Sequence, residues 1–264
     1  MMTEPARHGA VTGLLAASPA AAGRPRYTVL VASEPAEIVA AQRLRHQVFA
    51  GELGARLRSP VAGLDLDELD RFCDHLIVRD DRSGSVIGTY RMLPSHRAAQ
   101  AGRLYSDGEF ELTRLTPLRS SLVEVGRSCV HPDHRDGSVI NLMWSGIARY
   151  MHLSGHGWLA GCASVPLADG GTQAAAVWEY VRAKHFAPPE YRVIPRNPWR
   201  GAAAAGRVGR SALPPLLRGY LRLGAWVGGE PAHDPDFGVV DLFVLLAMDR
   251  IDGRYLRHFL GEAL

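Results

Sequence analysis

Apolar residues follow two periods along this chain, one typical of strands and one typical of helices. Short runs rich in β-branched and aromatic residues predict strands, and longer segments with apolar positions three or four residues apart predict helices. The strands are expected at 27–32, 74–78, 85–93, 158–164 and 239–248. The helices are expected at 34–49, 172–184, 213–223 and 252–260, with Ser33 as the N-cap of the first. Helices mixed with hairpins predict an α/β fold with an open, partly antiparallel sheet.

The central stretch, residues 121–151, predicts a strand, a polar loop and a helix. Its apolar strand is interrupted by Glu124 and Arg127, and residues 132–138 break the chain before the helical pattern begins. The N-terminus of such a helix has unpaired backbone N–H groups, which suit a phosphate. Many α/β proteins contain a unit of this kind, but charged side chains inside an apolar strand are costly to bury unless they are paired or needed for chemistry. Glu124 and Arg127 therefore mark a candidate site.

Three further segments lack a clear period. Residues 1–25 are expected to be a flexible lead-in to a single domain over 26–264, because Thr, Gly, Ser and Pro interrupt the apolar stretch that a signal peptide would need. Residues 188–210 read as a connection, and residues 51–70 as a mobile lid or connection. The last of these contains an acidic cluster of Asp65, Asp67, Glu68 and Asp70. The cluster is either a solvated loop or a site that captures a cationic substrate.

Composition and charge exclude several classes of protein. The formal net charge is only +3 and no nucleic-acid recognition module is present, so no nucleic-acid partner is expected. The three cysteines lack zinc-ligand spacing, and His131 and His134 have no further ligands grouped with them, so no metal site is expected. An odd number of cysteines and the lack of any run of eighteen apolar residues indicate a reduced, cytoplasmic protein without a membrane span.

The strand and loop of the central stretch resemble motif A of the GNAT acyltransferase superfamily. In that motif the pantetheine and pyrophosphate of an acyl donor lie against a splayed strand and the N-terminus of the next helix. The resemblance implies a GNAT-like α/β fold, with a mixed, mostly antiparallel splayed sheet flanked by helices, and donor contacts at Val130, Arg135, Gly137 and Ser138. Loop 135–140 keeps one glycine, shifted from its usual place, and ends in isoleucine. This departure favours acyl carrier protein over acyl-CoA as donor.

Several stretches are also similar to the ornithine Nα-acyltransferases, which make lyso-ornithine lipid. They lie within residues 44–49, 70–76, 88–94, 105–112, 124–130, 161–164 and 216–225. The resemblance implies a cytoplasmic enzyme of lipid metabolism, peripheral to the inner face of the membrane. It would transfer a 3-hydroxyacyl chain from acyl carrier protein to the α-amine of L-ornithine, with no further cofactor.

Part of this skeleton also resembles the acyl-homoserine-lactone synthases. The shared features are an early Arg45 and Phe49, Asp70 before the first hairpin, Arg91 in the second strand, and Glu-x-x-Arg at 124–127. They imply substrate binding by the first four residues. A lactone synthase or another amino-acid N-acyltransferase is therefore the alternative enzyme, although the chain lacks the early tryptophan expected of lactone synthases. A non-catalytic module that binds acyl carrier protein or lipid is the alternative outside enzymes.

Amide formation from a thioester needs a neutral amine, an oriented carbonyl group and stabilisation of an oxyanion. Glu124 is the candidate catalytic base, because burial in an apolar strand raises the pKa of a carboxyl group. Arg127, the second catalytic candidate, lies on the opposite face of an ideal strand, so only a bulge or splay brings both into one pocket. Otherwise Arg127 forms a structural ion pair. Direct attack is expected, because no nucleophile elbow surrounds Ser128 and a strand cysteine such as Cys129 is more often simply buried.

Segment 214–226 is amphipathic, with Arg218 and Arg222 one helical turn apart. It is either the late helix of the superfamily, packed on the sheet beside the acyl donor, or a contact with anionic lipid headgroups. The second reading predicts a peripheral membrane contact.

Overall fold

A nine-stranded sheet runs through the part of the chain that this computed structural model describes, residues 11–18, 26–135, 137–201 and 213–260. The strand order is β1-β2-β3-β4-β6-β7-β11-β10, and β9 pairs with β11. Its strands are β1 (Gly13–Ala17), β2 (Tyr27–Val31), β3 (Asp74–Asp80), β4 (Val86–Leu93), β6 (Leu122–Val130), β7 (Trp158–Pro166), β9 (Trp226–Val227), β10 (Ala232–Asp234) and β11 (Val239–Ala247). All neighbours are antiparallel except β6 and β7, which are parallel. The short strands β5 (Phe110–Glu111) and β8 (Ile194–Pro195) form a separate pair.

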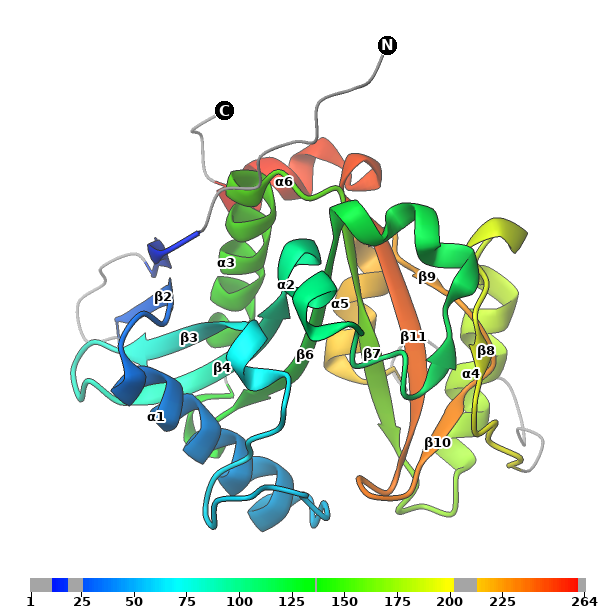
Figure 1. Cartoon of the computed structure of the whole chain (residues 1–264), viewed down its shortest axis with the longest axis horizontal. Helices are drawn as coiled ribbons and strands as arrows, with labels where there is room; N and C mark the ends of the chain where they lie inside the picture. Colours follow the sequence, from blue (N-terminus) through cyan, green and yellow to red (C-terminus); the bar gives the residue numbers. More distant parts are fainter. Residues whose placement is uncertain (1–10, 19–25, 136, 202–212, 261–264) are drawn as a thin grey trace.

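The helices cover both faces of this sheet (Figure 1). They are α1 (Pro35–His46), α2 (Ser95–Ala101), α3 (Ser138–Ser154), α4 (Thr172–Lys184), α5 (Pro215–Arg222) and α6 (Gly253–Leu260). A π-helical turn (Gln47–Glu52) extends α1, and 3-10 turns lie at Asp70–Phe72, Thr113–Ser121, Pro132–His134, Pro189–Tyr191 and Met248–Arg250. The predicted fold class, an α/β fold with a mixed and mostly antiparallel sheet, is confirmed.

Two local expectations are corrected. The N-cap of α1 is Glu34 rather than Ser33, and the Glu37 carboxylate accepts the backbone N–H groups of both residues. Within the expected flexible lead-in, Gly13–Ala17 forms β1, which pairs with β2. The edge strand forms because Leu15 and Val11 bury their side chains in the main apolar cluster. Residues 1–10 and 19–25 of the lead-in, and 202–210 of the expected connection, lie outside the described residues.

Side chains of successive strand residues alternate between the two faces of the sheet. On β3, Leu76 and Val78 pack with α3, whereas Ile77 packs on the opposite face with Ala41 of α1. We call the side covered by α3, α4 and α5 the α3 face, and the side covered by α1 and α2 the α1 face.

The same alternation on β11 decides where its charged residue lies. Val240 and Leu242 pack on the α3 face, and Phe243 packs on the α1 face. Asp241 therefore belongs to the α1 face. In the part of the chain that the structure describes, no helix is both long enough and apolar enough to cross a membrane.

Candidate active site

The sheet opens where β6 and β7 separate. The two strands pair only over 122–124 and 158–160, after which β6 continues beside β4 and β7 beside β11. Figure 1 shows them meeting in the middle of the sheet and then diverging. Gly161 lies at the divergence, where an added Cβ would come within 2.3 Å of the Val125 carbonyl oxygen. Only glycine permits this close approach of the two strands, so a side chain at position 161 would push β6 and β7 apart.

A β-bulge in β6 brings Arg127 to the face that holds Glu124. The register between β4 and β6 shifts at this point, and Arg127 has a φ of 54°, in the left-handed region. Before the bulge, the even-numbered residues of β6, such as Leu122, lie on the α1 face. After the bulge, the odd-numbered residues, such as Cys129, lie on that face. Glu124 and Arg127 therefore line one cavity, as the sequence allowed only if the strand was bulged or splayed.

Glu124 is buried at the start of the opening, with 4% of its surface exposed. Its Oε2 accepts the backbone N–H of Tyr105 at 2.5 Å, and its Oε1 accepts that of Ser106 at 2.8 Å. Burial raises the pKa of Glu124 above its ordinary value, although the hydrogen bonds oppose this change. The side chain thus fixes the 105–106 turn at the rim of the opening and has an increased affinity for a proton.

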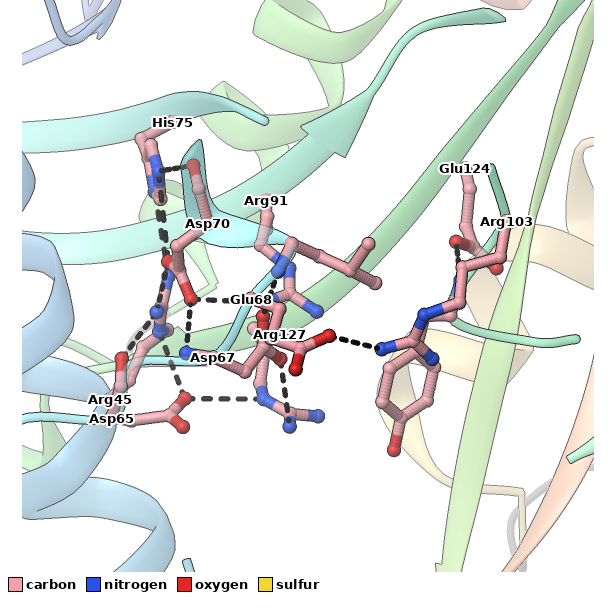
Figure 2. Close-up of polar contacts among 12 residues, drawn as sticks. Arg45, Asp65, Asp67, Glu68, Asp70, His75, Arg91, Arg103, Glu124 and Arg127 are labelled. Atoms are coloured by element: carbon pink, nitrogen blue, oxygen red, sulfur yellow. Dashed lines mark hydrogen bonds and ion pairs between the residues drawn. The ribbon is translucent and has the colours of Figure 1, made fainter. Parts of the chain in front are cut away.

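A buried ionic network lies near Glu124 (Figure 2). Arg45 is fully buried and pairs with two carboxylates, Asp65 at 3.0 Å and Asp70 at 2.6 Å. Burial, and then the charge of Arg45, lowers the pKa of the adjacent His75, so its imidazole is neutral near pH 7. The predicted substrate-binding residues Arg45 and Asp70 therefore lie inside the network and do not line the cavity that contains Glu124.

Arg91 and Arg127 complete the network from β4 and β6. Arg91 Nη1 lies 2.7 Å from Asp67 Oδ1 and 3.2 Å from Asp70 Oδ2, and Arg127 Nε lies 3.2 Å from Asp65 Oδ2. Three guanidinium groups face three carboxylates, so their formal charges cancel.

The acidic loop was expected to be either solvated or a site for a cationic substrate, and its buried carboxylates fit neither expectation. Asp65 and Asp70 are buried and paired with arginines, so they are neither solvated nor free to capture a cation. Asp67 is partly exposed, and it is paired with Arg91. Only Glu68 of the cluster lies at the surface, where it pairs with Arg103 at 3.5 Å. The loop 51–70 is anchored by these contacts instead of forming an unattached lid.

Two cavities meet at the opening. The first, about 980 Å³, lies on the α1 face and is lined by Phe49, Arg91, Glu124 and Arg127 among others. We call it the Glu124 cavity. The second, about 1450 Å³, runs along α3, and most of the side chains that α3 and α5 contribute to it are apolar. We call it the α3 cavity. The residues that line both are Phe49, Glu52, Leu53, Tyr90, Ser128 and Leu216.

The predicted donor residues lie at one end of the α3 cavity. Val130, Arg135 and Gly137 line it, and Ser138 begins α3 directly after Gly137, whose φ is 89°. Arg135 donates two hydrogen bonds to the Glu52 carboxylate, at 2.6 and 2.7 Å, and one to the Val130 carbonyl oxygen at 3.0 Å. The guanidinium is thus held at the mouth of the cavity, next to the helix N-terminus.

Comparison with known proteins agrees with this geometry. Residues 44–145 match the family described as acetyltransferase (GNAT) domain. The chain is 35% identical over 256 residues to the L-ornithine N(alpha)-acyltransferase of Brucella abortus (strain 2308), covering 89% of each protein. It is 36% identical over 235 residues to the enzyme of the same name from Rhodobacter capsulatus, covering 83% of this chain and 89% of the relative. The chain belongs to the L-ornithine N(alpha)-acyltransferase family. It is accordingly an acyltransferase.

Similar solved structures are more distant in sequence. FeeM, an N-acyl amino acid synthase from uncultured soil microbes, has a TM-score of 0.50 at 14% identity, over 86% of this chain and 93% of that one. BjaI, a CoA-dependent acyl-homoserine lactone synthase, has a TM-score of 0.49 at 14% identity, over 87% of this chain and 85% of that one. At this level of identity, the likeness to FeeM shows the fold alone.

Sequence reasoning missed an acidic group of this ornithine-acyltransferase family member. Glu109, Asp234 and Asp241 come together from distant parts of the chain, with carboxylate oxygens within 4.8 Å of one another. The signal that singled out Glu124, a charge inside an apolar strand, applies equally to Asp241 in the run 239–248. Carboxylates are also ligands of hard cations, so the expected lack of a metal site stays a prediction.

The amphipathic segment forms the packed late helix, α5. Leu217, Tyr220 and Leu221 are buried, and Tyr220 makes a 2.6 Å hydrogen bond with the buried Tyr90 hydroxyl. Arg218 and Arg222 are exposed and line the α3 cavity, and Arg222 Nε donates to the Tyr255 hydroxyl at 2.9 Å. Their contact with lipid headgroups stays a prediction.

Proposed function

We propose that this acyltransferase moves a 3-hydroxyacyl chain from acyl carrier protein to the α-amine of L-ornithine and releases lyso-ornithine lipid. The observation that carries the proposal is the meeting of two cavities at the opening between β6 and β7, beside the buried Glu124. One cavity can hold an amine and the other an acyl thioester, so that the two reactants meet at the opening. The named activity of the Brucella and Rhodobacter relatives supports ornithine as the amine.

The amino acid occupies the Glu124 cavity in this proposal. Arg127 lines that cavity. Its ion pairs, Nε to Asp65 at 3.2 Å and Nη2 to Asp67 at 3.6 Å, are longer than the shortest pairs of Arg45 and Arg91 in the same network. A guanidinium group in this state can donate to the α-carboxylate of an amino acid. The α-amine then faces the opening, where the thioester arrives from the α3 cavity.

The acyl donor occupies the α3 cavity. Met143, Trp144 and Leu221 give it an apolar lining that suits an acyl chain. The start of α3 at Ser138 provides backbone N–H groups for the phosphate of a phosphopantetheine arm. Loop 135–140 has a single glycine, and Arg135 beside it is already paired with Glu52, which leaves few groups for the further phosphates of CoA. This composition supports acyl carrier protein as the donor, with no further cofactor.

The reaction follows as one nucleophilic substitution at the thioester carbon. The amine nitrogen attacks the carbonyl carbon, the C–N bond forms, the C–S bond breaks, and the carrier leaves as its thiolate. Glu124 accepts the proton that the amine loses, directly or through a water. Backbone N–H groups of β6 beyond residue 124, where β7 no longer pairs with it, can donate to the oxyanion.

A covalent route through cysteine is disfavoured. Cys129 lines the α3 cavity, but burial raises the pKa of its thiol to about 12, so it carries almost no thiolate near pH 7. Cys162 in the Glu124 cavity is likewise buried, and burial raises the pKa of its thiol well above the ordinary value. Cys129→Ala is therefore expected to keep its activity.

Thiol release from 3-hydroxyacyl carrier protein, measured with and without L-ornithine, tests the proposal. We expect release that depends on ornithine, a much lower rate with the corresponding acyl-CoA, and an N-acylated product in the mass spectrum. Thiol release that ornithine does not accelerate, or equal efficiency with acetyl-CoA, would contradict the proposal.

Glu124→Gln should lower the rate by about 2 to 4 orders of magnitude, the usual contribution of a general base. In this variant an amide NH₂ faces one of the two backbone N–H groups that the carboxylate now accepts, so the melting temperature of the variant must be recorded as a control. The rate of the unmodified protein should also rise with pH through the raised pKa of Glu124. A folded variant with full activity would remove Glu124 from the mechanism.

A further inference from the structure

Three carboxylates converge on the far side of the Glu124 cavity. Asp241 comes from β11, Asp234 from β10, and Glu109 directly precedes β5. Asp234 and Asp241 line the cavity and are almost completely buried, with 7% and 3% of their surfaces exposed. The proposed amino acid would therefore share its cavity with a group of negative charges.

The hydrogen bonds made to these carboxylates leave part of the group without a partner. Ser164 Oγ donates to Asp241 Oδ1 at 2.6 Å, and the backbone N–H groups of Asp236 and Phe237 donate to Asp234 Oδ1 at 2.9 and 3.1 Å. Among the described residues, no hydrogen bond or ion pair reaches the second oxygen of Asp241, Oδ2, although that side chain is nine-tenths buried and faces the cavity. An oxygen in this state indicates a donor that comes from outside the chain.

The charge of Arg127 favours ionisation of Glu109 and Asp241, but the ion pairs of Arg127 are with Asp65 and Asp67. Within the described chain, none of the three carboxylates forms an ion pair with an arginine, lysine or histidine. Burial, and then the neighbouring Asp241 and Asp234, raises the pKa of Glu109 to about 7. Burial raises the pKa of Asp241 to about 6. Near pH 8 the group is ionised at an energetic cost, which a bound cation would relieve.

We propose that Asp241, assisted by Glu109 and Asp234, binds the side-chain ammonium of the acceptor amino acid and so selects ornithine over amino acids without a terminal charge. This inference rests on the proposed function, because it assigns a ligand group within the same cavity. Arg127 and the three carboxylates then recognise opposite ends of one molecule, which carries a carboxylate at one end and an ammonium at the other.

The register of the sheet sets the distance that ornithine and the two acidic side chains span together. Glu124 pairs with Ala160 on one side of β7 and Asp241 pairs with Ser164 on the other. Their backbones are therefore roughly 13 Å apart along β7 and roughly 10 Å apart across it, or roughly 16 Å in all. The two acidic side chains line the same cavity, and their length shortens this distance. Both lie on the α1 face. The two nitrogens of extended ornithine are about 6 Å apart, and a hydrogen bond of about 2.8 Å at each end extends this reach to roughly 12 Å. Cys162 lies midway and lines the cavity floor between the two acids.

The test compares L-ornithine with L-norvaline, which has the same carbon chain but no terminal ammonium. We expect Asp241→Asn to lower kcat/KM for ornithine by about 10- to 100-fold, the effect of losing a charged hydrogen bond, and to leave kcat/KM for norvaline unchanged. Asn keeps the size of the side chain and the acceptor for Ser164 Oγ. Asp249→Asn, at the exposed end of the same chain segment, is the matched control and should keep the parent ratio.

Each result decides the proposal. An unchanged ratio of ornithine to norvaline in a folded Asp241→Asn variant would overturn it, and so would loss of the ratio after treatment of the parent with EDTA, which would assign the carboxylates to a metal ion. If Asp241→Asn fails to fold, the ratio of kcat/KM for ornithine to that for norvaline is measured instead in Glu109→Gln, a change at a half-buried position. The proposal predicts a lower ratio in this variant too. If the parent releases no thiol with ornithine, the proposed function fails and the inference with it. Turnover of ornithine with an equal rate for norvaline overturns the inference alone.

Discussion

Two acidic groups lie near the same cavity and differ in how their charge is balanced. Asp65, Asp67 and Asp70 are paired with three arginines of the protein. Glu109, Asp234 and Asp241 have carboxylate oxygens within 4.8 Å of one another but form no ion pair within the described residues. The first group closes a loop onto the sheet, and the second leaves unbalanced charge against a cavity.

Whether a buried carboxylate has an arginine partner distinguishes a structural role from a ligand-binding role. A buried carboxylate that has an arginine partner is satisfied in the free protein, so a ligand gains little from it. A buried carboxylate without one is destabilising until a cation arrives. The acidic residues that are clustered in the sequence thus hold the fold together, whereas those that are scattered over it face the proposed substrate.

The largest expected effect comes from breaking the balanced group. Arg45→Met leaves Asp65 and Asp70 buried without their main partner, and should lower the free energy of unfolding by about 3 to 5 kcal/mol. Denaturant unfolding followed by circular dichroism measures this change.

Arg103→Met provides the control, because it removes the exposed pair with Glu68 and should cost no more than about 1 kcal/mol. Similar losses in the two variants would show that the buried network is not what anchors the loop.

Removing a charge from the unbalanced group should increase the free energy of unfolding. The folded protein raises the pKa of Asp241 to about 6, from an ordinary value of 3.8, so its contribution to stability is lost as the pH rises through 6. Glu109 and Asp234 oppose its ionisation and Arg127 favours it. At pH 8, Asp241→Asn should therefore be more stable than the parent by about 1 to 3 kcal/mol.

The difference between parent and variant should shrink towards zero by about pH 3, below the ordinary pKa of 3.8, where the carboxyl group is mostly protonated in both the folded and the unfolded states. Thermal unfolding at a series of pH values checks this. A variant that is less stable than the parent at pH 8 would mean that Asp241 is needed by the fold and is not strained by it.

Much of this architecture could be predicted from the chain. The helix expected at 172–184 and the strand expected at 239–248 were found with at most one residue of difference, because their apolar periods match what the sheet and helices bury. Glu124 was found because a carboxylate inside an apolar strand has few structural explanations. Asp241 also lies inside an apolar strand, but it was recognised as a candidate site residue only from its surroundings in the structure.

What could not be predicted depends on contacts between distant segments. The bulge at Arg127 is a shift in pairing against β4, and the sequence of β6 shows only that such a shift was needed. The pairing of Asp65 and Asp70 with Arg45 depends on the path of a loop without periodicity. Glu109, Asp234 and Asp241 are joined by the fold across more than a hundred residues, and no local pattern connects them.

A crystal structure with L-ornithine bound would show directly whether Asp241 binds the side-chain ammonium. We expect the side-chain ammonium within about 3 Å of Asp241 Oδ2, and the α-amine at the opening beside Glu124. An ammonium bound at Asp67 or pointing into solvent, with Asp241 Oδ2 still unpartnered, would contradict this expectation.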